Sequence, residues 1–326
     1  MKALILDVAG ARFRLAELAR PEAAAGQVLV RIHASGVNPL DIKIRAGQAA
    51  HARHPLPAIL GLDLAGIVEQ VGPGVTDFRL GDEVYGMTGG VGGIQGSLAE
   101  FAAVDSRLLA LKPTTLSMRE AAAVPLIFIT AWEGLVDRVK LDAHRNVLVL
   151  GAGGGVGQMA IQIARSIGSQ VYGLDRAGKA DSIRSAGATP IDLATESVDA
   201  YVAKYTGGKG FDVVFDTVGG SSLDSAFVAV RQFGHVVTAL GWGTHSLAPL
   251  SFKSGTYSGV FTLAPLLTGE GREHYGEILR EATRLANDHQ LRPLLDPHRF
   301  TLANALDAYA LLEQRQARGK LVVEIE

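Results

Sequence analysis

The chain has 326 residues, 48 % of them hydrophobic and 20 % charged, a composition typical of a globular protein with room for one large or two ordinary domains. Its 31 basic and 33 acidic side chains give a formal net charge of −2, which argues against the strong positive field that holds nucleic acid or an anionic membrane. Because there is no cysteine, disulfides, thiolate nucleophiles, iron–sulfur clusters and cysteine-ligated zinc are excluded.

The first 115 residues predict an antiparallel, barrel-like unit. The chain opens on MKALILDVAG, whose apolar run is too short for a signal peptide and indicates a first strand. No stretch approaches the roughly 20 apolar residues of a membrane span, so we expect a cytoplasmic protein. One short helix is predicted at Pro39–Ala46, and the glycine-rich run 86–96 predicts a mobile loop or a loop that covers a site. The predicted strands are Lys2–Leu6, Gln27–His33, Ala65–Val71 and Leu98–Val104.

From about residue 117 the pattern changes to alternating strands and helices. Ser117 followed by Glu120 predicts a helix that begins with a capping box. Alternation at this spacing is typical of right-handed βαβ units on a parallel sheet. The predicted strands are Asn146–Leu150, Gln170–Leu174, Phe211–Phe215 and His235–Leu240, and the helices between them are Gly155–Ile167, Lys179–Ala186 and Ser222–Val230.

The tail predicts two helices, at 272–289 and 302–315, and a closing strand at Leu321–Ile325. That strand has no partner nearby in the sequence, so we expect it to pair with the first unit. The α/β chain would then have a discontinuous first domain, 1–124 completed by 265–326, with a parallel-sheet domain at 125–264 inserted into it.

The segment VLVLGAGGGVG at 147–157 lies where a predicted strand turns into a predicted helix. Glycines there allow a tight turn and a close approach of the main chain to a pyrophosphate, with the helix N–H groups facing the phosphates. The flanking strand–helix–strand context favours a dinucleotide site over a simple turn. We assign Gly151, Gly153, Gly154, Gly155, Val156, Gly157 and the later Gly241 to that site.

Asp175 lies at the end of the next strand, where an acidic residue binds the ribose hydroxyls of NAD. Arg176 and Lys179 follow at once, and either could bind the 2′-phosphate of NADP. The two cations favour NADPH, with NADH as the alternative. Asp175 could instead pair with Arg176 or cap the following helix.

The glycine turn and the segment GVNPLDIKIRAG (36–47) together resemble the medium-chain dehydrogenase/reductase superfamily, in its quinone oxidoreductase and alkenal reductase branch. Further similar stretches are PAILGLDLAGIVEQVGPGVTDFRLGDEVYG (57–86), AAAVPLIFITAWEGL (121–135) and GKLVVEI (319–325). The resemblance implies a GroES-like β-barrel domain with an inserted Rossmann domain. It also implies a homodimer formed through the edges of the Rossmann sheets.

The sequence departs from the zinc-dependent alcohol dehydrogenases of the same superfamily. Their first cysteine ligand is matched here by Asn38, and their Gly-His-Glu motif by Gly61-Leu62-Asp63. With no cysteine and no paired histidines, no zinc-ligand set carries over, so we expect no metal.

The same resemblance places the Asn-Pro-x-Asp segment beside the nicotinamide, which nominates Asn38, Asp41 and Lys43 as catalytic residues and Thr130 as a cofactor contact. Lys43 takes the place of a tyrosine found in some quinone oxidoreductases, which favours the alkenal and enone reductases. The local pattern also allows a structural interpretation: Asn38 can cap the helix, and Asp41 can pair with Arg45 four residues later. For Asp41 the two interpretations stay open.

We therefore expect a zinc-independent oxidoreductase that transfers hydride from NAD(P)H to a quinone or an α,β-unsaturated carbonyl compound. Without a metal, Lys43 and Asn38 would donate hydrogen bonds to the developing enolate. The alternative is a non-catalytic NADPH-binding protein, crystallin-like or regulatory. The net charge argues against an RNA-binding role.

Overall fold

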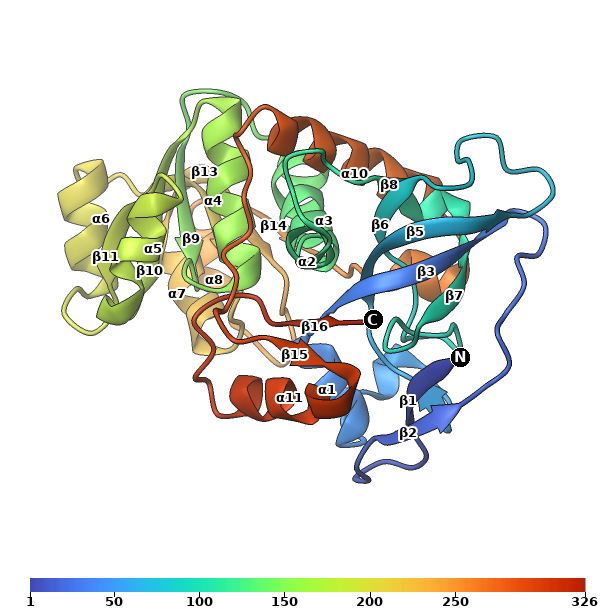
Figure 1. Ribbon diagram of the computed structural model, residues 1–326. Coiled ribbons are helices and arrows are strands. Elements are labelled where there is room, and N and C mark those ends of the chain that lie inside the picture. The colour runs from blue at the N-terminus through green and yellow to red at the C-terminus, as the bar shows by residue number, and fades with distance from the viewer. Residues whose placement is uncertain (326) are drawn as a thin grey trace. The chain divides into compact units, whose positions relative to one another are not determined.

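The computed structural model describes residues 1–325, which fall into two compact units (Figure 1). The first unit is discontinuous and consists of Met1–Leu126 and Leu263–Glu326, and the second is Ile127–Thr262. The second unit is thus inserted in the chain of the first.

The strands of the first unit are antiparallel except for the parallel pair β15 and β16 (Figure 1). One sheet has the order β2-β1-β4, and a larger one has the order β15-β16-β3-β5-β6-β8, with β7 also paired to β3. Its helices are α1 (Pro39–Arg45), α2 (Met118–Ala122), α9 (Ala264–Thr268), α10 (Arg272–Asn287) and α11 (Ala305–Glu313). Its strands are β1 (Lys2–Leu6), β2 (Arg14–Glu17), β3 (Gln27–Gly36), β4 (Ala58–Ile59), β5 (Asp63–Val71), β6 (Glu83–Met87), β7 (Phe101–Asp105), β8 (Leu109–Leu111), β15 (Phe300–Thr301) and β16 (Val322–Glu324).

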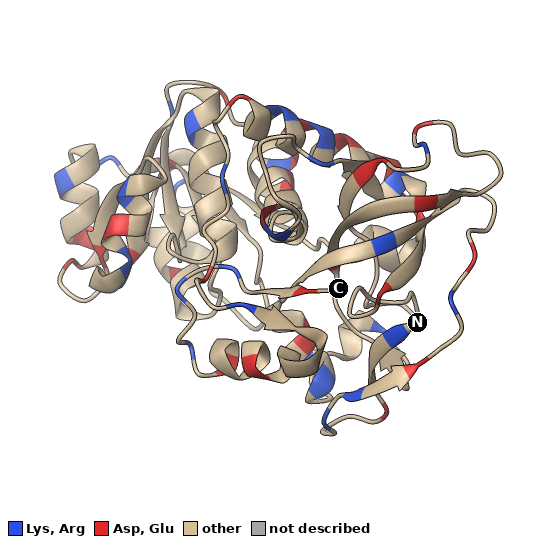
Figure 2. Cartoon of the chain, viewed as in Figure 1, with Lys and Arg blue, Asp and Glu red and all other residues tan. Residues whose placement is uncertain are grey.

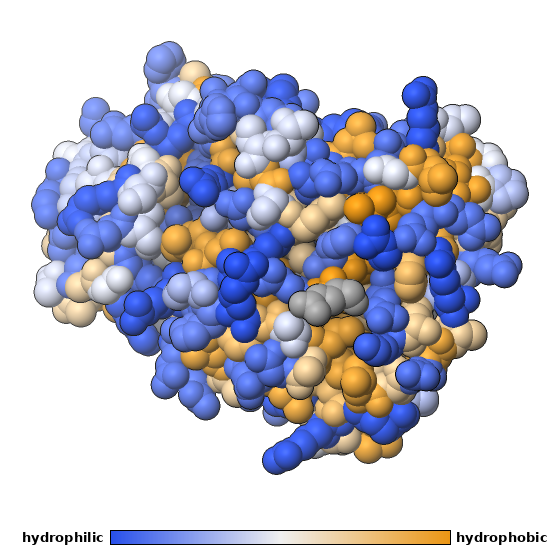
Figure 3. Space-filling view, viewed as in Figure 1, coloured by the Kyte–Doolittle hydropathy of each residue, from blue (hydrophilic) through white to orange (hydrophobic). Residues whose placement is uncertain are grey.

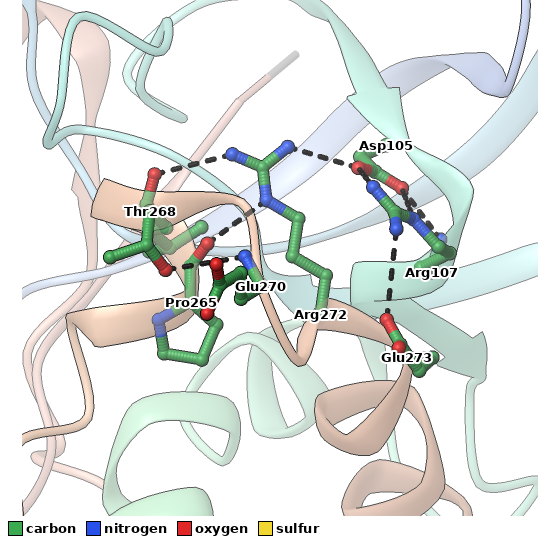
Figure 4. Close-up of polar contacts among 8 residues, drawn as sticks. Asp105, Arg107, Pro265, Thr268, Glu270, Arg272 and Glu273 are labelled. Carbon is green, nitrogen blue, oxygen red and sulfur yellow. Dashed lines mark hydrogen bonds and ion pairs between the residues drawn. The ribbon is translucent and has the colours of Figure 1, made fainter.

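The last strand returns to the first unit, as its lack of a local partner predicts. β16 pairs antiparallel with β3, with Val323 opposite Ser35. A polar cluster also ties the returning segment to the first part of the chain (Figure 4). The Arg272 guanidinium donates to Asp105 at 3.0 Å and to the carbonyl oxygen of Pro265 at 3.1 Å, and Asp105 also binds Arg107.

The second unit contains a six-stranded parallel sheet in the order β11-β10-β9-β12-β13-β14, which confirms the predicted fold class (Figure 1). Its strands are β9 (Asn146–Leu150), β10 (Gln170–Asp175), β11 (Thr189–Asp192), β12 (Phe211–Asp216), β13 (Val230–Thr238) and β14 (Thr256–Gly259). Its helices are α3 (Pro125–Trp132, whose first two residues belong to the other unit), a π-helix at Glu133–Arg138, α4 (Gly155–Ile167), α5 (Ala180–Ser185), α6 (Val198–Thr206), α7 (Ser221–Ala229) and α8 (Ala248–Ser251).

Both faces of this sheet are buried, as expected when helices cover a parallel sheet on each side. Leu148 and Leu150 of β9 pack in one apolar cluster with Tyr201 of α6 and Phe227 of α7. The residues that alternate with them in β9, such as Val149, are equally buried on the opposite face. The carboxyl ends of the strands are therefore held in place by apolar packing on both faces of the sheet.

One local expectation needs correction. The strand expected from Leu98 begins at Phe101, because the N–H of Leu98 bonds instead to the carbonyl of Leu60. The run 86–96, expected to be a mobile loop or a loop that covers a site, is mostly buried. A Cβ on Gly89 would lie 1.9 Å from the carbonyl oxygen of Gln95, and one on Gly96 2.2 Å from that of Leu60. Glycine is required here by close backbone packing.

Charged side chains of both signs are interspersed over the units (Figure 2). On the face drawn in Figure 3, hydrophilic residues predominate and apolar ones lie between them. Within the described residues, no helix combines the length and apolarity needed to cross a bilayer.

Candidate functional site

The glycine turn follows β9 and leads into α4, and two of its glycines have no room for a side chain. Gly151 has φ +75°, and a Cβ there would lie 2.5 Å from Oγ1 of Thr217. A Cβ on Gly157 would lie 2.4 Å from the carbonyl oxygen of Gly151. These glycines bring the start of α4 against the end of β9, as the sequence predicts for a tight strand-to-helix turn.

The amino end of α4 is open at the N-cap residue, Gly154. Gly154 is exposed, and its missing Cβ would meet only the Gly151 carbonyl oxygen, at 3.3 Å. The N–H groups of the first helical turn, from Gly155 through Val156 to Gly157, have no acceptor inside the helix. An unobstructed helix start with free donors fits a diphosphate, which would take the space that a side chain at Gly154 would fill.

Asp175 at the end of β10 is turned toward the same glycines. One carboxylate oxygen accepts the Gly153 N–H at 2.8 Å, and the other accepts the Arg176 N–H at 2.8 Å. The alkyl chain of Lys179 covers Gly153 so closely that a Cβ there would lie 2.6 Å from Lys179 Cβ. The structure thus gathers Asp175 and Lys179 around Gly153, while the Arg176 side chain is exposed.

Thr130 and Gly241, two further predicted cofactor contacts, lie elsewhere in the same unit. Thr130 is buried in α3, and its hydroxyl shares a hydrogen bond of 2.9 Å with that of Thr262. Gly241 is exposed after β13, and a Cβ there would lie 2.4 Å from the Tyr257 hydroxyl oxygen.

In the first unit, Asn38 lies at the centre of a buried polar network. Its amide nitrogen donates to Asp63 at 3.0 Å and to the carbonyl oxygen of Gly36 at 3.3 Å. Its amide oxygen accepts from the Lys320 ammonium, which also lies 3.4 Å from Asp63. Burial raises the pKa of Asp63 and lowers that of Lys320, and each charge opposes the shift of the other.

Asp41 is enclosed in the same region, one helical turn into α1. Its carboxylate accepts the Asn38 N–H at 3.0 Å and the Gly61 N–H at 3.2 Å, and the Tyr309 hydroxyl lies at 3.4 Å. Burial raises the pKa of Asp41 to about 7. The expected pair of Asp41 with Arg45 is wrong, because Arg45 binds Glu313 at 2.5 Å instead.

The three predicted catalytic residues differ in burial and in hydrogen bonding. Asn38 and Asp41 have no exposed surface, and their polar atoms are hydrogen-bonded within the protein. The expectation that the Asn38 amide donates to a substrate is therefore revised: both of its amide hydrogens have acceptors in the protein. Lys43, two residues further along α1, is exposed, and its side chain has no hydrogen bond or ion pair to any residue in 1–325.

Lys320 is the member of this network that the sequence analysis did not identify. It is 282 residues from Asn38 in the sequence, so no local spacing could connect them. The available signal was a lysine placed two residues before the buried strand β16, a position where a charge needs a partner.

The same network bears on zinc. At the position that matches the first cysteine ligand of the zinc enzymes, Asn38 instead binds the Lys320 ammonium, which also lies beside the Asp63 carboxylate. Among residues 1–325 no group of three histidine, aspartate or glutamate side chains is arranged to hold a metal ion. This donor set, with an ammonium group among the side chains, does not fit a zinc ion.

Comparison with known proteins agrees with this architecture. Residues 24–114 match the alcohol dehydrogenase GroES-like domain and residues 186–323 the zinc-binding dehydrogenase family. The chain is similar to a 2-methylene-furan-3-one reductase from Solanum lycopersicum. The two sequences are 35 % identical, and the match covers 94 % of this chain and 74 % of that protein. It is also similar to an NADPH-dependent alkenal/one oxidoreductase, chloroplastic, from Arabidopsis thaliana. Here the identity is 34 %, and the match covers 93 % of this chain and 73 % of that protein.

Among solved structures, an alcohol dehydrogenase superfamily protein from Novosphingobium aromaticivorans is 56 % identical, with a TM-score of 0.98 and full coverage of both chains.

Proposed function

The chain belongs to the medium-chain dehydrogenase/reductase superfamily, in its quinone oxidoreductase and alkenal reductase branch, and we propose that it reduces α,β-unsaturated carbonyl compounds or quinones with NADPH. The two curated relatives named above are both reductases, one of a furanone and one of alkenals and enones. Oxidoreductase chemistry follows from the family, and the substrate class is our proposal.

The cofactor-binding role of the second unit rests on the fit of the glycine turn. When bound, the nicotinamide supplies the hydride. We assign the diphosphate to the N–H groups that begin α4, over Gly154, because that helix start is open and its donors lack acceptors. Thr130 and Gly241 belong to the proposal as contacts of the nicotinamide half.

The observation that carries the catalytic proposal is the exposed, unpaired ammonium of Lys43. Hydride addition to the β-carbon of an enone places negative charge on its carbonyl oxygen, and a solvent proton then completes the saturated ketone at the α-carbon. A positioned donor at that oxygen stabilises the charge as it develops. Lys43 is the one member of the predicted catalytic trio whose donors are available, while Asn38 and Asp41 fix the helix that carries it.

Replacing Lys43 tests the proposal. Lys43→Met should lower kcat with an enone by about 10² to 10³, the range for loss of one oxyanion donor. The Kd for NADPH, from cofactor fluorescence, should not change, and Lys43→Arg should lose less because it keeps a cation. An unchanged kcat in Lys43→Met, or the absence of turnover across a panel of enones and quinones, contradicts the proposal. The second result would favour a non-catalytic, NADPH-binding role.

The preference for NADPH over NADH is proposed from the residues around Gly153. Lys179 and the exposed Arg176 supply two cations where a 2′-phosphate would bind, and both Asp175 oxygens already accept backbone N–H groups. Lys179→Ala should selectively lower kcat/KM with NADPH, and Asp175→Ala should raise it. A wild type that prefers NADH and loses this preference in Asp175→Ala would show that the carboxylate dominates.

We further propose a homodimer and a cytoplasmic location. β14 lies at the edge of the parallel sheet, so its outer backbone groups are available to pair with the same strand of a second copy. Light scattering of the purified chain distinguishes dimer from monomer, and cell fractionation tests the location.

A further inference from the structure

Two large aromatic side chains are exposed beside each other in the second unit. Trp242 follows β13 and is 53 % exposed, and Phe261 follows β14 and is 40 % exposed. Their rings meet edge to face, with centroids 6.2 Å apart and an interplanar angle of 87°. Trp242 leaves about half of a large aromatic surface exposed, and neither the glycine turn nor Lys43 accounts for this pair.

The position of the pair in the sheet points to a ligand. Both residues lie beyond the carboxyl ends of parallel strands, the edge at which doubly wound sheets bind ligands. The glycine turn follows β9 and Asp175 ends β10, on one side of the sheet order, whereas β13 and β14 lie on the other. A dinucleotide that extends from Asp175 across the glycine turn directs its nicotinamide half toward β12–β14, where the hydride acceptor must also bind.

The segments that carry the two aromatic rings are anchored. His245 donates to the carbonyl oxygen of Trp242 at 3.2 Å and lies 2.8 Å from the Asp224 carboxylate of α7. On the other segment, Thr262 next to Phe261 shares its 2.9 Å hydrogen bond with Thr130. An aromatic site held in place by its neighbours loses little entropy when it binds a flat ligand.

We propose that Trp242 and Phe261 recognise an aromatic ring conjugated to the enone, so that the preferred substrates are aryl-substituted α,β-unsaturated ketones. This inference rests on the proposed function. A ring of the substrate can stack on the exposed indole while the edge-to-face contact with Phe261 holds the indole in place. Such a contact increases affinity by about 10-fold over that of an aliphatic enone of the same reactivity.

Binding can be read without turnover, because the chain has two tryptophans, Trp132 and Trp242. In Trp132→Phe, the fluorescence comes from Trp242. We would titrate this variant, saturated with NADP⁺, with 4-phenyl-3-buten-2-one and with 3-penten-2-one, which carries a methyl in place of the phenyl group. The aryl enone should quench Trp242 and bind about 10-fold more tightly than the aliphatic one.

Turnover then assigns the effect. Trp242→Ala should lower kcat/KM for the aryl enone about 10-fold and leave that for 3-penten-2-one and the Kd for NADPH nearly unchanged. Phe252→Ala is the matched control, because Phe252 is also exposed in this unit but precedes β14 rather than following it. This control should behave as the wild type does.

Three results would overturn the inference: equal affinity for the two enones, loss of NADPH binding in Trp242→Ala, or a changed oligomeric state in that variant. The second would make Trp242 a cofactor residue and the third an interface residue. The proposed function fails separately, if no enone or quinone is reduced. Tight quenching of Trp242 by the aryl enone would still support the aromatic site in that case.

Discussion

Replacing Lys320 with methionine would remove the one positive charge from the buried network around Asn38. Asp63 would keep two donors, the Asn38 amide at 3.0 Å and the Leu126 N–H at 2.9 Å, but lose its counter-ion at 3.4 Å. The amide oxygen of Asn38 would lose its donor as well. Removing one partner of a buried ion pair costs about 3 to 5 kcal/mol. We therefore expect the unfolding free energy of Lys320→Met to fall by about that amount.

Thermal unfolding followed by circular dichroism measures the effect. For a unit of this size about 1 kcal/mol corresponds to roughly 2–4 °C, so the melting temperature should fall by roughly 10 °C. Lys43→Met, at an exposed lysine without a partner in the same unit, is the control and should change stability by less than about 0.5 kcal/mol. The double variant Lys320→Met/Asp63→Asn should recover part of the loss, because the uncompensated carboxylate is gone. A melting temperature for Lys320→Met equal to that of the control would refute the assigned role of the buried charge.

Further variants and conditions test the buried network, the glycine turn and the absence of zinc independently. Because the pKa of Asp41 is raised from 3.8 to about 7, the folded state holds a proton that the unfolded chain releases, so this contribution is full below pH 4 and is lost as the pH rises through 7. Urea unfolding of the wild type should give a free energy of unfolding that is roughly 2 to 3 kcal/mol lower at pH 7 than at pH 5, and Asp41→Asn should not show this decrease. An equal decrease in the wild type and in Asp41→Asn would contradict this role of Asp41. Gly151→Ala should lower the free energy of unfolding by about 1 to 3 kcal/mol and weaken NADPH binding, because Gly151 has a φ of +75° and lies against Thr217. Gly178→Ala is the control, because a Cβ at Gly178 would meet open space, and it should change neither quantity. Activity should survive a chelator, and a loss of activity that added zinc reverses would contradict the zinc-independent function.

The sequence determined the parts of this protein whose contacts are local. The strand, glycine turn and helix at 146–167 are neighbours in the chain, so the positions at which only glycine fits are visible in the sequence. The same holds for the helix that begins after Ser117, whose capping box needs only Ser117 and Glu120. The return of β16 to β3 could be predicted because an apolar terminal strand without a local partner must pair elsewhere.

Only the tertiary structure decided what the polar residues of the GVNPLDIK segment do. At the level of the helix, Asp41 and Arg45 are spaced for an ion pair, but Gly61, Tyr309 and Glu313 come from distant parts of the chain and supply other partners. Lys320 is also distant in the sequence, and its ammonium donates to the amide oxygen of Asn38 once the segment before the last strand is in place. Hydrogen bonds between residues hundreds of positions apart leave no periodic pattern in a sequence. The fold therefore determined which of the candidate side chains, Asn38 and Asp41, are buried in the polar network, and which, Lys43, is exposed.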